Sequence, residues 1–227
     1  MKALVSSLAL LVCAGLAPAN VTVTGNGKVV YIPDIGYITV GVSSDGKTAA
    51  EAWEKNREIV RRVFEALRRR GIDPKDMQTN GLNVSPKYIH RPGAEPELVG
   101  YTVSYTLRVT VRKLDQMSSV LDDLVESGAN RQMNIGFGCA DSEKLLDEAR
   151  ARAVADARKK AGLYATAVGA RLGKVLTISD QSYIPVRELQ YEHRVVPGSD
   201  KGMPIAAGEQ ELSVQVHLAY ALLDDTK

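Results

Sequence analysis

The stretch VGYTVSYTLRVTVR, residues 99–112, alternates between large apolar and small or polar residues without a break. Its odd-numbered positions carry valine, tyrosine and leucine, whereas its even-numbered positions carry glycine, serine, threonine and arginine. Because successive side chains of a strand point to opposite faces, the pattern predicts a β-strand with one buried and one solvated face. Such a strand is typical of an antiparallel sheet that is covered on one side.

Similar alternation predicts strands within residues 21–32, 38–42, 82–88, 133–139 and 212–222. Helical periodicity predicts helices from Thr48 to a stop at Gly71, from Leu114 to Ser127, and from Ser142 to about Val168. With one further strand expected between the last helix and residues 212–222, the order is β-β-α-β-β-α-β-α-β-β. It predicts an α+β fold with a mainly antiparallel sheet packed against three helices. Two β-α-β units, at 36–88 and 99–139, indicate structural repeats with halves 20–98 and 99–227.

Two details within these elements carry further expectations. The apolar stripe of the longest helix is mostly alanine and ends with Tyr164 and Val168, so we expect this helix to approach a sheet closely. Gly25-Asn26-Gly27 interrupts the first β segment and predicts a tight hairpin or a bulge.

The first nineteen residues predict a secretory signal peptide. Lys2 precedes an apolar run, and Ala17-Pro18-Ala19 forms a small-x-small cleavage site. A membrane anchor is the alternative, but the run is short for a span of about 20 residues. A lipoprotein signal would use Cys13, which follows a valine rather than a small residue. We therefore expect cleavage near Ala19 and a periplasmic or extracellular protein that starts at Asn20.

The mature chain would have little net charge and one cysteine. Loss of Lys2 lowers the net charge from +2 to +1, so no basic excess draws the protein to nucleic acid or to an anionic membrane. Cys139 is then the single cysteine, which excludes an internal disulfide. It lies on the apolar face of MNIGFGCA, and we predict a buried structural thiol rather than a reactive one.

Residues 41–48, GVSSDGKT, match the phosphate-loop pattern G-x-x-x-x-G-K-[ST]. In a nucleotide-binding loop, Gly41 and Gly46 let backbone N–H groups approach phosphates, Lys47 reaches the terminal phosphates and Thr48 binds magnesium. A phosphate-loop-like, nucleotide-binding hydrolase is therefore the alternative function. Ser44 to Lys47 also fits the S-x-x-K motif of penicillin-binding enzymes, but the partner motifs of that class are absent.

The context of GVSSDGKT argues against a phosphate loop. The strand before it alternates, whereas phosphate-loop strands are buried parallel strands with continuous apolar runs. Thr48-Ala-Ala-Glu51 reads as a helix capping box, which gives Thr48 a structural role. An exported protein would also meet little ATP. We interpret the stretch as a strand-to-helix junction.

No other residues form a persuasive catalytic, cofactor or metal site. His90, His193 and His217 share no ligand spacing, so we predict no metal. The arginines at 68–70 close a helix, where its dipole favours cations. Asn56 lies on an apolar helix stripe and predicts a buried, hydrogen-bonded asparagine.

Several stretches together resemble the SIMPL-domain family, which includes bacterial periplasmic immunogenic proteins. They are VTVTGNGKVVYIPD, GKTAAEAWEKN, GIDPKDMQTNGLNVSPKY, GYTVSYTLRVTVR and ARARAVADARKKAGLYATAVGARLGKVLTIS. The resemblance implies export, an α+β fold and, in some members, ring-like or channel-like homo-oligomers. It also implies a role in the cell envelope or in stress responses, and a eukaryotic relative that acts as a signalling adaptor. It brings no catalytic residues.

Self-assembly is also predicted from the segment of residues 184–208. The segment is long for a connector and rich in apolar residues. These residues would pack either on a neighbouring subunit or on the core of the same subunit. The β segment 20–32 offers an edge that another chain could extend. We therefore predict a non-enzymatic homo-oligomer, with an envelope protein as a further partner, no nucleic acid and no transmembrane span.

Overall fold

The computed structural model describes residues 19–181, 187–188 and 203–224. In chain order its elements are β1 (Asn20–Tyr31), β2 (Ile35–Gly46), α1 (Ala49–Arg69), β3 (Met77–Ile89), β4 (Glu97–Val111), α2 (Met117–Glu126), β5 (Arg131–Gly138), α3 (Ser142–Ala167), β6 (Ala170–Gln181), β7 (Arg187–Glu188) and β8 (Gln210–Asp224). Apart from the short β7 and two 3-10 turns, this is the predicted order, and the α+β class is confirmed. The predicted signal peptide and most of the 184–208 segment lie outside the described residues.

The strands form two antiparallel sheets, where the sequence had predicted one. The first sheet has the order β3-β4-β2-β5, and the second has the order β1-β8-β6 with β7 beside β8. The chain divides into two compact units. The first unit contains the described residues of Val29–Leu146 and Pro185–Leu212. The second unit contains the described residues of Met1–Lys28, Asp147–Ile184 and Ser213–Lys227. Alternation shows that a strand has a buried face, but it does not show which strands pair. The repeat of residues 20–98 and 99–227 stays a prediction.

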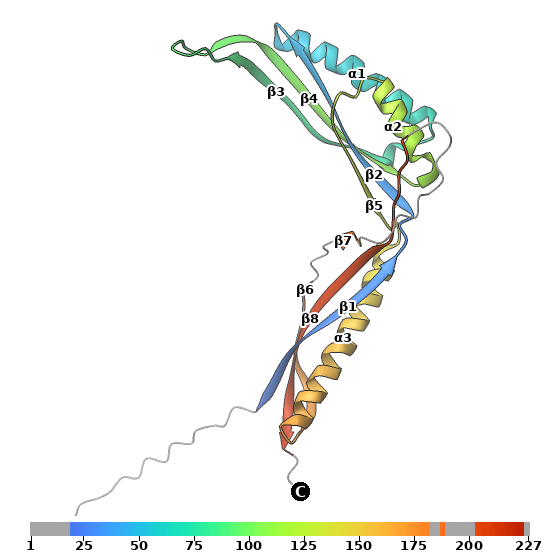
Figure 1. Cartoon of the computed structure of the whole chain (residues 1–227), viewed down its shortest axis with the longest axis vertical. Helices are drawn as coiled ribbons and strands as arrows, with labels where there is room; N and C mark the ends of the chain where they lie inside the picture. The colour runs from blue at the N-terminus through green and yellow to red at the C-terminus, as the bar shows by residue number, and fades with distance from the viewer. Residues whose placement is uncertain (1–18, 182–186, 189–202, 225–227) are drawn as a thin grey trace, which may run out of the picture. The chain divides into compact units, whose positions relative to one another are not determined.

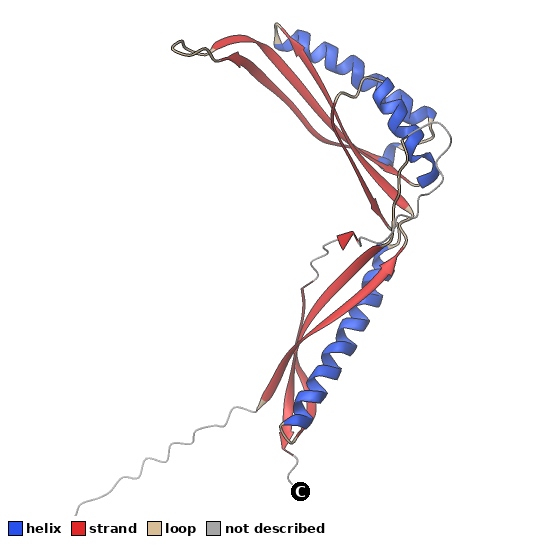
Figure 2. Ribbon diagram, in the orientation of Figure 1, coloured by secondary structure: helices blue, strands red, loops and turns tan. Residues whose placement is uncertain are grey.

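In the first unit, α1 and α2 cover one face of the β3-β4-β2-β5 sheet and leave the other face open (Figures 1 and 2). Paired residues such as Val40 and Leu107 share the covered face and are almost completely buried, together with Leu124 of α2. The helix α1 ends at the predicted stop. Gly71 has a φ of 75°, and its N–H and that of Ile72 donate to the last turn in a Schellman motif.

In the second unit, α3 runs along the β1-β8-β6 sheet (Figure 1). Its buried stripe consists of alanines at four-residue spacing: Ala149, Ala153, Ala157, Ala161 and Ala165. A Cβ on Gly27 of β1 would lie 1.8 Å from the carbonyl oxygen of Ala149, and one on Gly25 would lie 2.0 Å from that of Ala153. The predicted close approach is therefore confirmed, because the helix backbone lies against the strand backbone.

Parts of two expectations about this unit are wrong. The strand β1 runs through Gly25-Asn26-Gly27 without the hairpin, because the two glycines make room for α3, and the alternative of a bulge stays a prediction. Tyr164 and Val168 are exposed, because the buried stripe continues through Ala165 instead. From Ala161, a spacing of three residues leads to Tyr164 and a spacing of four leads to Ala165, and these two side chains lie on different sides of the helix. Only the packing of the helix decides which of them is buried.

Candidate functional site

GVSSDGKT lies where β2 ends and α1 begins. Its first six residues belong to β2 and pair with β4 throughout, from Gly41 opposite Thr106 to Gly46 opposite Tyr101. A phosphate loop needs a free turn whose N–H groups converge on an anion, whereas these residues form a regular antiparallel ladder. The geometry is that of the strand-to-helix junction that the sequence favoured.

Thr48 and Glu51 cap α1 at this junction. The Thr48 hydroxyl accepts the N–H of Glu51 at 3.2 Å, and the Glu51 carboxylate accepts the N–H of Lys47 at 2.9 Å. The return bond thus comes from Lys47 rather than from Thr48, a variation on the predicted capping box. The hydrogen bond from Lys55, aided by the Lys47 N–H, lowers the pKa of Glu51, so the cap is ionised at neutral pH.

The cap predicts a specific pair of mutational effects. Thr48→Ala should lower the free energy of unfolding by about 1 kcal/mol through loss of the cap. Lys47→Ala should change it by less than about 0.5 kcal/mol, because its side chain is at the surface. Urea unfolding followed by the fluorescence of Trp53, the one tryptophan of the chain, measures both. Calorimetric titration with Mg-ATP should show no binding, and micromolar affinity that Lys47→Ala abolishes would restore the nucleotide hypothesis.

Asn56 is buried, as predicted, with 3% of its surface exposed. Its Nδ2 atom lies 3.3 Å from the carbonyl oxygen of Val42, 3.2 Å from that of Val103 and 3.3 Å from the Ser44 hydroxyl. The amide therefore joins α1 to β2 and β4 by hydrogen bonds, which is a structural role.

Cys139 and the described histidines form no common site. Cys139 is half-buried rather than buried, because β5 ends at Gly138 and the cysteine lies just beyond the covered face. His90 is exposed after β3, and His217 lies 2.9 Å from the Thr24 hydroxyl within the second unit. His193 lies outside the described residues. Across residues 19–181, 187–188 and 203–224, no group of three His, Cys, Asp or Glu side chains could hold a metal ion.

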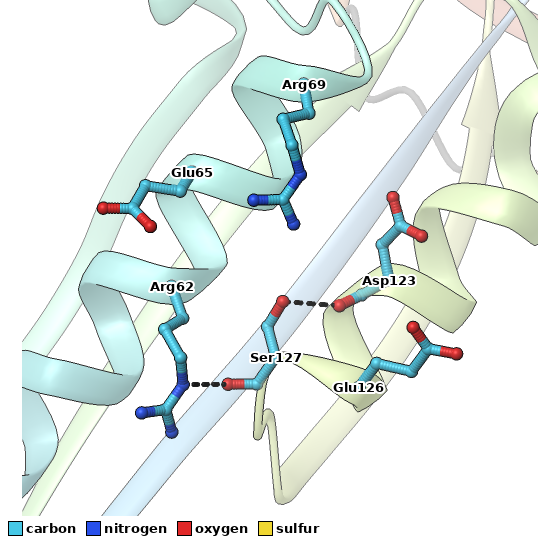
Figure 3. A pocket seen from close by; sticks show the side chains of 6 residues that line it. All are labelled: Arg62, Glu65, Arg69, Asp123, Glu126 and Ser127. Atoms are coloured by element: carbon cyan, nitrogen blue, oxygen red, sulfur yellow. Dashed lines mark hydrogen bonds between the residues drawn. The ribbon is translucent and has the colours of Figure 1, made fainter.

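A polar hollow of about 280 Å³ lies between α1 and α2 (Figure 3). It is lined by Arg62, Glu65, Arg69, Asp123, Glu126 and Ser127. Arg62 donates to the Ser127 carbonyl, and the Ser127 hydroxyl donates to the Asp123 carbonyl. Arg70 hydrogen-bonds to Asp123 and thereby lowers the pKa of that carboxyl. Charges of both signs meet here, so this is a contact between helices rather than a patch for nucleic acid.

An apolar groove of about 130 Å³ lies between α1 and the edge of the first sheet. Its walls are Trp53, Asn56, Arg57 and Val60 of α1, Leu82 of β3 and Tyr105 of β4. Trp53 is 43% exposed and Leu82 is 49% exposed. The groove exists because β3 is the edge strand of the sheet, while α1 packs mainly over β2 and β4.

Exposed apolar side chains continue along β3 from this groove. Leu82 and Val84 pair with Tyr105 and Val103, so they belong to the face that α1 covers elsewhere in the sheet. The sequence predicted that Leu82, Val84 and Tyr88 form an apolar strand face, and the structure leaves all three exposed. Alternation does not mark a strand as an edge strand, but Pro86 within β3 is a local signal of one, because proline has no N–H to donate to a neighbouring strand. We call Leu82, Val84 and Tyr88 the β3 strip.

Comparison with known proteins identifies a family and several relatives of this chain. The SIMPL family, described as "Protein of unknown function (DUF541)", matches residues 21–220. The "26 kDa periplasmic immunogenic protein" of Brucella melitensis is 34% identical over 213 residues, which cover 90% of this chain and 85% of that protein. The "Uncharacterized protein YggE" of Escherichia coli K12 is 29% identical over 159 residues, covering 70% of this chain and 64% of that protein. A family match over nearly all of the described sequence shows that the chain belongs to the SIMPL family.

Proposed function

We propose that this protein is an exported, non-enzymatic component of the cell envelope that acts by associating with further copies of itself. The exposed β3 strip beside the apolar groove is the observation that carries the proposal. Export is supported by the predicted signal peptide and by a relative whose name describes it as periplasmic. In the described residues, no helix is long and apolar enough to cross a membrane. As part of this proposal, the assembled protein would be ring-like or channel-like and would act in the cell envelope or in stress responses.

A second copy of the chain fits the β3 strip. The strand β3 has 13 residues, and within the described residues its outer edge pairs with no other strand. Two such edges can meet antiparallel about a twofold axis, which extends both sheets and buries both strips in a dimer. A ring-like form would join such dimers through a further contact. The adjacent surface of α1 carries paired charges of both signs, in Lys55–Glu51 and Arg57–Glu54, so two copies would not repel one another.

The predicted interface in the 184–208 segment can be judged only at its described end. Ile205 packs against the core of the first unit, and the Met203 carbonyl accepts the Ser118 hydroxyl at 2.8 Å. This end therefore lies on its own subunit. The remainder of that interface stays a prediction, and the β3 strip is the surface on which we place assembly.

Light scattering on the mature protein tests the assembly proposal. The wild type should be oligomeric at micromolar concentration. The double variant Leu82→Lys/Val84→Lys should weaken association at least about tenfold, because it removes more than about 1.4 kcal/mol of apolar burial and places charges on the edge. The control is Val125→Lys on α2, an exposed valine outside the strip, which should behave as wild type. A wild type that stays monomeric at every concentration, or a double variant that assembles normally, would refute the proposal.

A further inference from the structure

A second hollow lies on the open face of the first sheet, away from α1 and α2. Its volume is about 420 Å³. Its walls are Thr39 and Gly41 of β2, Asn83 of β3, Ser104 and Thr106 of β4, and Arg131 and Gln132 of β5. The intervening residues Val40 and Leu107 are buried beneath the helices, so the residues that alternate with them point to the open side. All four strands of the sheet contribute to this hollow.

Glycines produce the depression. Thr106 is flanked in the sheet by Gly41 on one side and by Gly81 on the other. A Cβ on Gly81 would meet no atom within 4 Å, so the sheet is open beside Thr106, whereas a Cβ on Gly41 would lie 3.0 Å from the Arg131 Cβ, so Gly41 makes room for the Arg131 side chain. Glycine within a strand costs about 0.5–1 kcal/mol relative to alanine.

Bulges border the same row on both sides. The pairing of β3 with β4 shifts between Thr79 and Gly81, which leaves Asn80 as an extra residue. The pairing of β5 with β2 shifts at Gly41, which leaves Gln132 as an extra residue. Bulges redirect side chains and are frequent beside binding sites. Here they lie on the two outer strands, and the one in β5 lies beside Arg131 and Gln132 at the rim of the hollow.

The hollow combines one cation with neutral hydrogen-bonding groups. The Arg131 Nη1 atom donates to the Ser104 hydroxyl at 2.7 Å, and the other polar wall groups are hydroxyls and amides. No carboxylate lines it, and within the described residues no ion pair involves Arg131. By contrast, Asp45, farther along this face, pairs with Lys87 and accepts from Thr102. Among the residues that the structure describes, the Arg131 guanidinium at the rim of the hollow thus has no carboxylate counterion.

A further arginine adds to this positive field. Arg108 is paired with Thr39, so it lies on the same face, and its guanidinium carbon is 4.4 Å from the centre of the Tyr37 ring. The ring holds Arg108 without neutralising it. Two guanidinium groups therefore favour a ligand with negative charge.

We propose that this hollow binds a small hydroxylated anion, of the class of sugar acids and sugar phosphates. The carboxylate or phosphate accepts hydrogen bonds from the Arg131 guanidinium. The ligand hydroxyls exchange hydrogen bonds with Thr39, Thr106 and Asn83, which can donate and accept. The volume lies within the range of small-molecule sites, about 300–1,000 Å³. The site faces away from the α1-covered side that carries the β3 strip, so it is independent of the proposed assembly.

Isothermal titration of the mature protein with glucuronate and with glucose 6-phosphate tests this site, with glucose and inorganic phosphate as controls. We expect saturable binding of at least one of the two charged sugars, at least tenfold tighter than either control. Binding of glucuronate would identify the anionic group as a carboxylate, and binding of glucose 6-phosphate would identify it as a phosphate. Binding of neither charged sugar, or equal binding of glucose or inorganic phosphate, would overturn the proposal.

Variants locate the binding to the hollow. Arg131→Gln should weaken binding of the charged sugar at least tenfold, whereas Arg61→Gln on the exposed surface of α1 should leave it unchanged. Gly81→Val should also weaken binding, by placing a side chain beside Thr106; a Cβ at Gly81 meets no atom within 4 Å, so the fold should tolerate it. The unfolding midpoint by Trp53 fluorescence shows whether each variant is folded. Folded Arg131→Gln and Gly81→Val variants that bind like wild type would refute the assignment.

Discussion

Replacing Asn56 with aspartate should lower the free energy of unfolding by about 3–5 kcal/mol. The side chain is buried, and its Nδ2 atom faces the carbonyl oxygens of Val42 and Val103. A carboxylate there would remove the donor and bring a negative charge against the two carbonyl oxygens. Unpaired buried charges are among the most destabilising single changes in proteins.

The measurement is urea unfolding at neutral pH, followed by the fluorescence of Trp53 on the same helix. Asn134→Asp on β5 is the matched control, because that asparagine is exposed, and it should change stability by less than about 0.5 kcal/mol. Burial raises the pKa of a carboxyl group, so the loss in Asn56→Asp should shrink as the pH falls and the group is protonated. A loss below about 1 kcal/mol at neutral pH would show that Asn56 does not join α1 to the sheet as described.

Gly27→Ala should destabilise the second unit by about 3 kcal/mol or more, at the upper end of overpacking effects. The added Cβ would lie 1.8 Å from the carbonyl oxygen of Ala149, and backbone atoms cannot move aside as a flexible side chain can. To relieve the clash, α3 must move away from β1, which opens the alanine stripe to water.

Gly162→Ala is the matched control for that experiment. Gly162 lies on α3, and a Cβ there meets no atom within 4 Å, so the substitution should stabilise the helix by about 0.5–1 kcal/mol. Thermal unfolding by circular dichroism gives both changes, and hydrogen exchange of the α3 amides locates them. If Gly27→Ala unfolds like wild type, the close approach of β1 and α3 is wrong.

Local chemistry was sufficient to predict the elements of this protein. Unbroken alternation predicted β4, and the cap at Thr48 and the stop at Gly71 predicted the ends of α1. Asn56 was recognised because one amide interrupts an otherwise apolar stripe. Each of these signals depends on residues close together in the chain, so it can be recognised without knowledge of which strands pair.

Contacts between distant residues decided the rest. Alternation predicted an apolar face on β3 but not that β3 is an edge strand, which is why the exposure of Leu82 and Val84 was missed. The hollow around Thr106 was also missed, because Gly41 and Gly81 lie forty residues apart in the chain and become neighbours only through β4. A strand carries the same pattern of side chains whichever strands flank it. The pairing partners therefore determine which apolar residues stay uncovered and where glycines meet, and both proposed surfaces of this protein depend on that pairing.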